Sequence, residues 1–437
     1  MGRTARYLVS RNFALLWVAQ ATSSFGEFVL GATATVWLVL DLARNDPLLP
    51  TYVAAVVIAS SAPRLFIAPF AGVWVDRWRA KPTMVWADVI RAALIVPVIA
   101  IASTGPSKQL MIGSLLCLLL GISVLSQFFN PARAALMQVV IPAERRVDAS
   151  SKSMFAGLGV AVIAAALGPA LFSLYGAIPA LAANMLTFLV SALVIAQTRN
   201  LAVIPISEPE IASFWSRFRS GIVTAWRVRS IRMVLIGVGL YGVSLGINNA
   251  VLSLFALETL RLSAAEYGMV AASFSLGGLI GAAFAAPLVR KVGSERLFPS
   301  VIVALGLCYF GYAFTRDFWS AAGMMLLCGV GFAVYLVAQG PILQASTPPG
   351  FMGRVTAVSV PILGLSSTLS TVISSQLLSY ASVRAADAGS SLDPRAYAIA
   401  IAAGATVLCI GGVVMTLGAH QEPRKTASWV SSPERPS

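Results

Sequence analysis

The stretch Gly72-Val-Trp-Val-Asp76-Arg77-Trp-Arg79-Ala-Lys81-Pro82 decides how this chain is interpreted. It places one acid and three bases within a few residues, between the apolar runs 51–75 and 83–103. A connection this short allows only a tight turn between two helices. We therefore interpret it as a latch at the cytoplasmic edge of a membrane, formed by Asp76, Arg77 and Lys81. Gly72 marks a position where two helices are expected to cross closely.

The composition is that of a membrane protein. Of the 437 residues, 58% are hydrophobic and 11% are charged, whereas about 25% are charged in a typical soluble domain. Apolar runs of about 20 residues, the length that crosses a bilayer, recur along the whole chain. They predict twelve membrane helices at 13–40, 51–75, 83–103, 110–130, 153–175, 177–198, 232–257, 264–289, 297–315, 318–343, 355–382 and 396–418.

The distribution of lysine and arginine predicts the orientation. Of the 31 such residues, 23 fall in the two tails and in the connections on the same side, and six fall in the connections on the other side. The remaining two, Arg64 and Arg91, lie within predicted helices. Because basic residues are enriched on the cytoplasmic side of membrane proteins, both termini are predicted to be cytoplasmic.

The longest hydrophilic segment divides the chain into two halves. We expect an N-terminal bundle over 1–198, a cytoplasmic linker over 199–231, a C-terminal bundle over 232–419 and a tail over 420–437. Arginines alternate with aromatic residues in the linker, which favours an amphipathic helix on the anionic inner leaflet. The net charge of +14 is explained by these loops, so no nucleic-acid partner is expected.

The two halves carry related motifs in the same order. Ser24-Phe-Gly26 resembles Ser244-Leu-Gly246, and Phe70-Ala71 resembles Phe284-Ala285. Gln138 and Pro142 recur as Gln344 and Pro348. The pattern predicts a duplicated six-helix unit, hence an all-α membrane protein of twelve helices in two pseudo-symmetric bundles. This is a transporter layout, in which the substrate site lies between the halves near the middle of the membrane.

Charged residues inside membrane helices mark candidate functional positions, because each costs about 2.5–3.5 kcal/mol at a helix centre. Glu27 lies about 14 residues into the first helix, near mid-membrane. Desolvation there favours the protonated acid, so Glu27 can exchange protons, as a proton-coupled antiporter requires. The alternative is a structural ion pair with Arg64, at similar depth in the second helix, which would argue against proton carriage.

Other polar positions are predicted to gate the transporter or to line its cavity. Asp88 and Arg91 are three residues apart on one helix, so they share a face and can pair, in a structural or gating role. Asp76 can accept hydrogen bonds from the N-terminus of a neighbouring helix. Seven polar residues within predicted helices are candidates for the substrate pathway or for helix-to-helix hydrogen bonds: Gln127, Asn130, Tyr241, Asn248, Asn249, Tyr335 and Gln339.

Several function classes are excluded or disfavoured. The four cysteines lie inside apolar runs without paired spacing, and the single histidine, His420, lies at the start of the tail, so neither a disulfide framework nor a metal centre is indicated. The sequence has no G-x-x-x-x-G-K-S/T loop, so ATP is not the energy source within this chain. Enzyme activity is not expected, and no cofactor is predicted apart from the proton gradient.

The 72–82 stretch resembles the loop G-x-x-x-D-R-x-G-R-R/K of the major facilitator superfamily, through Gly72, Asp76, Arg77 and Lys81. It departs from that pattern at Arg79 and Ala80. Further motifs resemble the macrolide-efflux and enterobactin-exporter-like branch of drug:proton antiporters. These motifs are Arg11-Asn-Phe13, Ser24-Phe-Gly26-Glu27, Ala87-Asp88-Val-Ile-Arg91, Phe129-Asn130-Pro131-Ala132-Arg133 and Gly353-Arg354-Val355.

The resemblance implies that Asp76 meets the start of the eleventh helix near Arg354, with Arg133 supplying a nearby cation. Together with the patterns above, it predicts a monomeric secondary transporter that exports a small amphipathic molecule, a drug or natural product, by proton antiport with alternating access. Such a protein would confer multidrug resistance. Alternatives are a siderophore exporter, a lysophospholipid flippase or, in a different class, a membrane receptor or scaffold that transports nothing.

Overall fold

The computed structural model describes residues 10–75, 78–141, 146–198, 228–347 and 352–420. The described residues form α-helices, two π-helical turns and short connections. The elements are α2 (Arg11–Trp37), η1 (Leu38–Leu42), α3 (Leu49–Phe66), α4 (Ala68–Val75), α5 (Ala80–Ser103), α6 (Lys108–Val140), α7 (Arg146–Tyr175), α8 (Ala177–Ala196), α10 (Arg229–Leu254), η3 (Phe255–Thr259), α11 (Ala264–Val292), α12 (Ser294–Ala313), α13 (Phe318–Ser346), α14 (Met352–Asp387) and α15 (Arg395–His420).

The predicted membrane architecture is confirmed. In the described ranges, eleven helical segments are long and apolar enough to cross a bilayer, and the apolar part of α7, Gly159–Tyr175, adds a shorter one. An even number of crossings returns the chain to its starting face. We call that face, where α2 begins and α15 ends, the terminal face. The opposite face, with the connections 43–48 and 388–394, is the far face.

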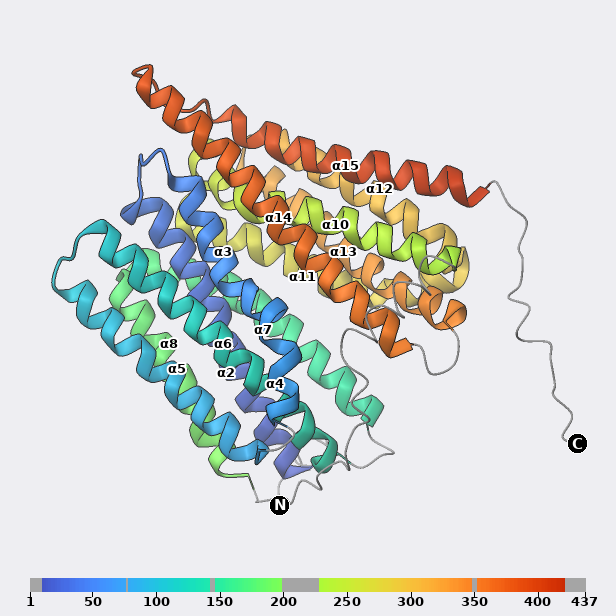
Figure 1. Cartoon of the computed structure of the whole chain (residues 1–437), viewed down its shortest axis with the longest axis horizontal. Helices are drawn as coiled ribbons and strands as arrows, with labels where there is room; N and C mark the ends of the chain where they lie inside the picture. Colours follow the sequence, from blue (N-terminus) through green and yellow to red (C-terminus); the bar gives the residue numbers. More distant parts are fainter. Residues whose placement is uncertain (1–9, 76–77, 142–145, 199–227, 348–351, 421–437) are drawn as a thin grey trace, which may run out of the picture.

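The helices form two bundles that repeat one packing pattern (Figure 1). In the N-terminal bundle α2 packs on α7 and α8, α3 on α6, and α5 on α6 and α8. In the C-terminal bundle α10 packs on α14 and α15, α11 on α13, and α12 on α13 and α15. The first helix of each bundle also ends in a π-helical turn, η1 or η3. The shared pattern confirms the pseudo-symmetric fold predicted from the repeated motifs.

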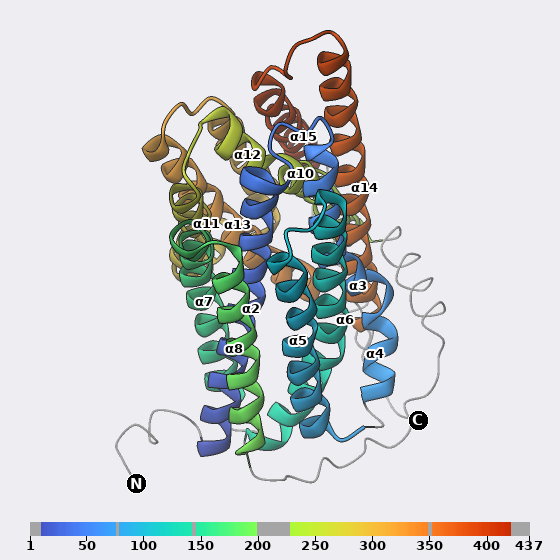
Figure 2. The same cartoon turned by 90° about the vertical axis from the view of Figure 1, so that its left-hand side faces the viewer.

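The bundles meet mainly through α7 with α11 and α3 with α14 (Figure 2), and α3 also contacts α10. The contact extends to the far face, where the backbone N–H of Thr51 donates to Ser379 Oγ over 3.1 Å and the two hydroxyl groups lie 2.8 Å apart. A Cβ on Gly268, near the far-face end of α11, would lie 2.9 Å from the carbonyl oxygen of Ala165 on α7. Toward the terminal face the bundles diverge (Figure 1).

The burial pattern of α3 shows where the opening between the bundles lies. Residues three, four and seven apart share a helix face. Val53 and Val56, near the far-face end, are buried, whereas Ser60 and Arg64, further along the same face, are exposed. The same trend appears on α2, which runs in the other direction. A half-exposed face that includes Glu27 becomes buried toward the far face. The opening is therefore closed at the far face and accessible from the terminal face.

The predicted second helix is broken, which corrects the range 51–75. α3 ends at Phe66 and α4 begins at Ala68. Pro63 lies in the last turn of α3, and Pro69 follows at the second position of α4. Proline has no backbone N–H to continue the helical ladder, and its ring crowds the carbonyl four residues earlier. A break is the expected consequence of two prolines separated by six residues.

The predicted fourth helix is longer than its range of 110–130, because α6 continues through Pro131 to Val140. Phe129, Ala132, Leu136 and Val140 recur at helical spacing and are all buried in one apolar cluster with α2 and α5. Burial of that stripe outweighs the hydrogen bond that Pro131 cannot make. The motif 129–133, of which the predicted range includes only the first two residues, thus lies entirely within the helix.

Some predictions concern residues outside the described ranges. They include Asp76 and Arg77 of the latch and most of the linker, so the domain boundaries and the amphipathic helix stay predictions. One motif of the repeat can be tested directly. Gly246 packs against α14, where an added Cβ would lie 2.8 Å from Ser370 Cβ and closer still to the carbonyl oxygen of Ser367.

We predict that Gly246→Ala lowers the stability of the protein by about 1–3 kcal/mol, because the backbone of α14 must move to admit one methyl group. The matched control is Gly323→Ala in α13, since a Cβ there meets no atom within 4 Å. That change should be neutral or slightly stabilising, because alanine is the better helix former. Thermal unfolding in detergent measures both. Equal melting temperatures for the two variants would contradict the close α10–α14 packing.

Candidate functional site

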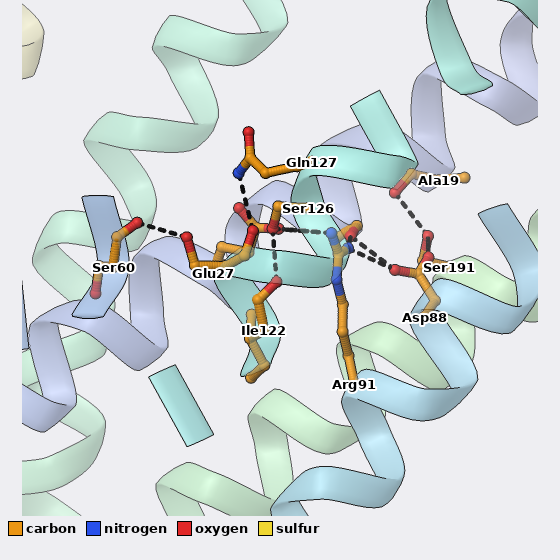
Figure 3. Close-up of polar contacts among 11 residues, drawn as sticks. Ala19, Glu27, Ser60, Asp88, Arg91, Ile122, Ser126, Gln127 and Ser191 are labelled. Carbon is orange, nitrogen blue, oxygen red and sulfur yellow. Dashed lines mark hydrogen bonds and ion pairs between the residues drawn. The ribbon is translucent and has the colours of Figure 1, made fainter. Parts of the chain in front are cut away.

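A buried arginine and two acids form the charged centre of the N-terminal bundle (Figure 3). The Arg91 side chain on α5 is 0% exposed. Its Nη1 lies 2.8 Å from Asp88 Oδ1, one turn earlier on the same helix. Its Nη2 lies 3.2 Å from Glu27 Oε1 on α2. The Asp88–Arg91 pair expected from the sequence spacing is therefore present, and Glu27 joins it from a second helix.

Three serine hydroxyl groups add hydrogen bonds to this centre. Ser126 on α6 donates to Glu27 Oε1 over 2.6 Å and accepts from Arg91 Nη2 over 2.9 Å. Ser23 on α2 and Ser191 on α8 donate to the two carboxylate oxygens of Asp88, over 3.1 Å and 2.6 Å. Four helices therefore contribute to one network, as buried charges require if they are not to remain unpaired.

Aromatic rings and a glycine shape the walls around Arg91. The guanidinium carbon lies 4.9 Å from the ring centroid of Phe129 and 5.5 Å from that of Phe188, distances at which a cation is attracted to a ring face. Gly26, the neighbour of Glu27, lies against α8, where a Cβ would collide with Thr187. The Gly26 carbonyl also accepts a hydrogen bond from Asn184 of α8. The missing side chain thus lets α2 approach α8 beside the charged centre.

The three charges do not balance, and their accessibility differs. Two carboxylates share one guanidinium, so the fully ionised centre carries one surplus negative charge. Asp88 is 0% exposed, whereas the Glu27 side chain is 38% exposed and faces the opening between the bundles. Glu27 is therefore the acid that water, protons or a cationic molecule can reach, while Asp88 and Arg91 are sealed behind it.

Arg64 does not occupy the position that the ion-pair alternative gave it. The pair that Glu27 forms is with Arg91, and Arg64 is exposed on α3, toward the opening. Sequence position alone placed Arg64 at a depth similar to that of Glu27, and it did not identify Arg91 as a partner of Glu27. The packing of both α2 and α5 on α8 decides the partner, because it brings the Glu27 carboxylate within reach of Arg91 on α5.

The candidate pathway residues divide into two groups. Asn130 is exposed, and Asn249 and Gln339 are half-buried. The other four are buried: Gln127, Tyr241, Asn248 and Tyr335. Tyr241 and Tyr335 pack against each other within the C-terminal bundle, with ring centroids 4.8 Å apart. Gln127 donates to the carbonyl of Ser123 on its own helix. In this conformation these four are buried in the packed core, so a place for them along the substrate pathway stays a prediction.

The predicted latch residues are only partly described. Lys81 donates to the carbonyl oxygens of Ala196 and Thr198, over 2.9 Å and 2.5 Å, and so binds the C-terminal end of α8 within its own bundle. A lysine there also complements the negative end of the helix dipole. Arg133 lies half-buried in α6. Asp76 and Arg77 lie outside the described residues, as do the surroundings of Gly72 and Arg354, so the latch itself stays a prediction.

A separate groove lies on the outer surface of the N-terminal bundle near the terminal face. Its volume is about 640 Å³, and its walls come from the connection after α4, from α5 and from α6. Trp74 and Trp78 both stack on Phe128, with centroids 6.0 Å and 5.9 Å apart. The lining residues are Trp78, Arg79, Pro82, Thr83, Trp86, Ala87, Ile90, Leu125 and Phe128.

Sequence reasoning missed the serines and rings that hold the charged centre. Ser23, Ser126 and Ser191 are small polar residues within apolar runs, and nothing in their spacing separates them from serines that bond only to their own helix. The hydroxyl groups of Ser60 and Ser61 on α3, for example, donate only to carbonyl groups of their own helix. The pairing of Ser126 with Glu27 spans 99 positions of the chain, so only the tertiary structure reveals it.

Two pseudo-symmetric helical bundles with a charged centre at the opening between them define a membrane transporter rather than an enzyme. The model of the transmembrane secretion effector family of the major facilitator superfamily matches residues 5–406. This chain belongs to that family, and it is a multi-pass membrane transporter of a small-molecule substrate in a lipid bilayer.

Relatives and solved structures agree with this assignment. The chain is 25% identical over 375 residues to YkuC of Bacillus subtilis, an uncharacterised transporter of the same superfamily, covering 82% of this chain and 84% of YkuC. It is 27% identical over 367 residues to BacE of Bacillus amyloliquefaciens, a candidate bacilysin exporter, covering 81% and 86% of the two chains.

Two transporters of known structure share the fold. A bacterial homologue of the iron transporter ferroportin, in an inward-facing state, superposes with a TM-score of 0.71 at 16% identity, covering 94% of this chain and 99% of the other. A variant of the nucleoside transporter NupG gives a TM-score of 0.70 at 12% identity, covering 93% and 100%. At these identities the likeness shows the fold alone.

We predict that Arg91→Met destabilises the protein by about 3–5 kcal/mol, because it leaves the buried Asp88 carboxylate without its cation. Arg91→Lys keeps the charge but loses the planar fork of the guanidinium. Its stability should therefore lie between that of Arg91→Met and that of the wild type. Melting temperature in detergent, followed by size-exclusion chromatography, measures the effect. The double variant Arg91→Met with Asp88→Asn should recover part of the loss. An Arg91→Met protein as stable as the wild type would contradict the network.

Proposed function

We propose that this protein exports a small amphipathic molecule in exchange for protons, by alternating access between the two bundles. The proposal places it with drug:proton antiporters of the macrolide-efflux and enterobactin-exporter-like branch. The observation that carries it is the half-exposed Glu27, bound to the sealed Arg91–Asp88 pair at the opening. The candidate bacilysin exporter BacE, a relative of similar length, supports export as the direction.

The charge balance of the centre suits an exchange reaction. In the conformation described here Arg91 pairs with both Glu27 and Asp88, so the fully ionised centre carries one surplus negative charge. A cationic substrate that enters the opening can neutralise that charge. When the opening faces the other side of the membrane, a proton can take the place of the substrate on Glu27. Because the two compete for one carboxylate, outward movement of substrate is coupled to inward movement of a proton.

The direction of transport follows from the proposed orientation. The excess of lysine and arginine on the terminal face favours a cytoplasmic location for that face and for both termini. The opening described here then faces the cytoplasm and is the conformation that loads substrate. In the opposite conformation, Asp76, Arg77 and Arg133 would hold the terminal ends of the bundles together. A monomer contains every element that this cycle uses.

We predict that Glu27→Gln abolishes substrate-driven proton movement, because glutamine cannot bind or release a proton. The wild type and the variant are reconstituted in proteoliposomes with a pH-sensitive dye inside. Ethidium and other substrates first identified by accumulation in an efflux-deficient host then start the exchange. Glu295→Gln is the matched control, since Glu295 is an exposed acid at the start of α12. Unchanged proton movement in Glu27→Gln would refute the coupling role.

One observation favours a lysophospholipid as the alternative substrate. The groove lined by Trp78, Trp86 and Phe128 lies on the outer surface of the membrane domain, where it can take an acyl chain. A flippase for such a lipid needs no proton exchange. Transfer of a fluorescent lysophospholipid between the leaflets of proteoliposomes, unaffected by a protonophore and by Glu27→Gln, would favour the alternative over proton-coupled export.

A further inference from the structure

Arg64 is an exposed cation within the membrane-spanning part of α3. In the described part of the chain it forms no ion pair, whereas Arg91 has two acidic partners. A charge at this depth is costly enough that it is rarely kept without a role. The position of Arg64 relative to Glu27 indicates what that role is.

The helix face of Arg64 points into the opening rather than toward lipid. Arg64 lies on the stripe that begins with Val53 and Val56, which are buried in the core near the far face. A residue on the lipid side of the helix would belong to a different stripe, as Phe66 does. Leu65, the next residue along the chain, contacts Gly364 of α14. Arg64 therefore stands beside the interface of the two bundles, where that interface opens.

Arg64 and Glu27 lie at nearly the same depth in the membrane. Ser60, one turn before Arg64, accepts a hydrogen bond from Ser123 of α6 over 2.6 Å. Ser126, three residues further along α6, is the serine that binds Glu27. α3 and α6 both run from the far face to the terminal face. At 1.5 Å per residue, Arg64 is about 6 Å beyond Ser60, and Ser126 is about 4.5 Å beyond Ser123.

The opening thus presents one accessible acid and one accessible guanidinium at a common level. A carboxylate or a phosphate is the group that a guanidinium fork binds best, through two parallel hydrogen bonds. Glu27, with the surplus negative charge of its centre, attracts an ammonium group. A molecule that carries both groups satisfies both residues, and it leaves neither charge unpaired when the opening closes around it.

We propose that Arg64 is the residue that recognises an acidic group of the substrate, and that the exported molecules are amphoteric, with an amine and a carboxylate. The inference rests on the proposed export function and adds the substrate class to it. Arg64 then acts in recognition, and Glu27 acts in both recognition and coupling. A purely cationic compound uses only the Glu27 half of the site.

The experiment compares three fluorescent probes in everted membrane vesicles. Norfloxacin carries an amine and a carboxylate, its ethyl ester carries only the amine, and ethidium is a permanent cation. Transport is measured for the wild type, Arg64→Gln and Arg64→Lys. The ratio of norfloxacin transport to ester transport should fall about tenfold or more in Arg64→Gln, because the charge-assisted pair is lost. In Arg64→Lys this ratio should fall less than in Arg64→Gln, because lysine keeps the positive charge.

The outcomes separate this inference from the proposed function. If Arg64→Gln lowers the transport of all three probes equally, Arg64 has a structural role and the inference is overturned, while proton-coupled export stands. If the wild type transports ethidium and the ester but not norfloxacin, the amphoteric class is wrong. If the wild type transports none of the probes and shows no proton exchange, the proposed function fails, and the inference fails with it.

Discussion

The structure of the N-terminal bundle depends on the cost of burying Arg91. A guanidinium without exposure inside a membrane domain must be matched by acids and hydrogen-bond acceptors, or the fold loses several kcal/mol. Asp88 supplies the first partner from the same helix, Glu27 the second from α2, and Ser126 an acceptor from α6. Ser191 of α8 in turn binds Asp88. One buried charge thereby fixes the positions of four helices.

The same network leaves one acid facing the opening. Because two carboxylates share a single cation, the centre is one proton or one cationic group short of neutrality. Asp88 is sealed, so Glu27 is the place where that deficit can be met. A structural ion pair and a functional carboxylate are usually treated as alternatives. Here the geometry joins them, since the pair orients Glu27 while the opening keeps it accessible.

Sequence reasoning found the charged positions, but it could not assign all their partners. The spacing of Asp88 and Arg91 predicted their contact, because residues three apart share a helix face. For Glu27 the sequence suggested only Arg64 as an ionic partner, whereas the actual partner, Arg91, depends on how α2 and α5 pack on α8. Gly26 contributes to that packing, because a Cβ there would collide with Thr187 of α8, and its carbonyl accepts from Asn184. The ends of the helices were also hard to predict, because they too depend on contacts between distant parts of the chain. Burial of Leu136 and Val140 carries α6 past Pro131, and no local signal reports such a contact.

The sequence by itself determined the membrane architecture, the twelve-helix duplication and the identity of the charged residues. Hydropathy, charge distribution and repeated motifs are properties of the chain that need no knowledge of distant contacts. Only the tertiary structure decided which charges are sealed and which are accessible. It buried Arg91 with two acids, exposed Arg64 beside the opening, and moved Tyr241 and Tyr335 into the core. Accessibility depends on the packing of helices far apart in the sequence, so the role of each charge follows from the fold and not from its position along the chain.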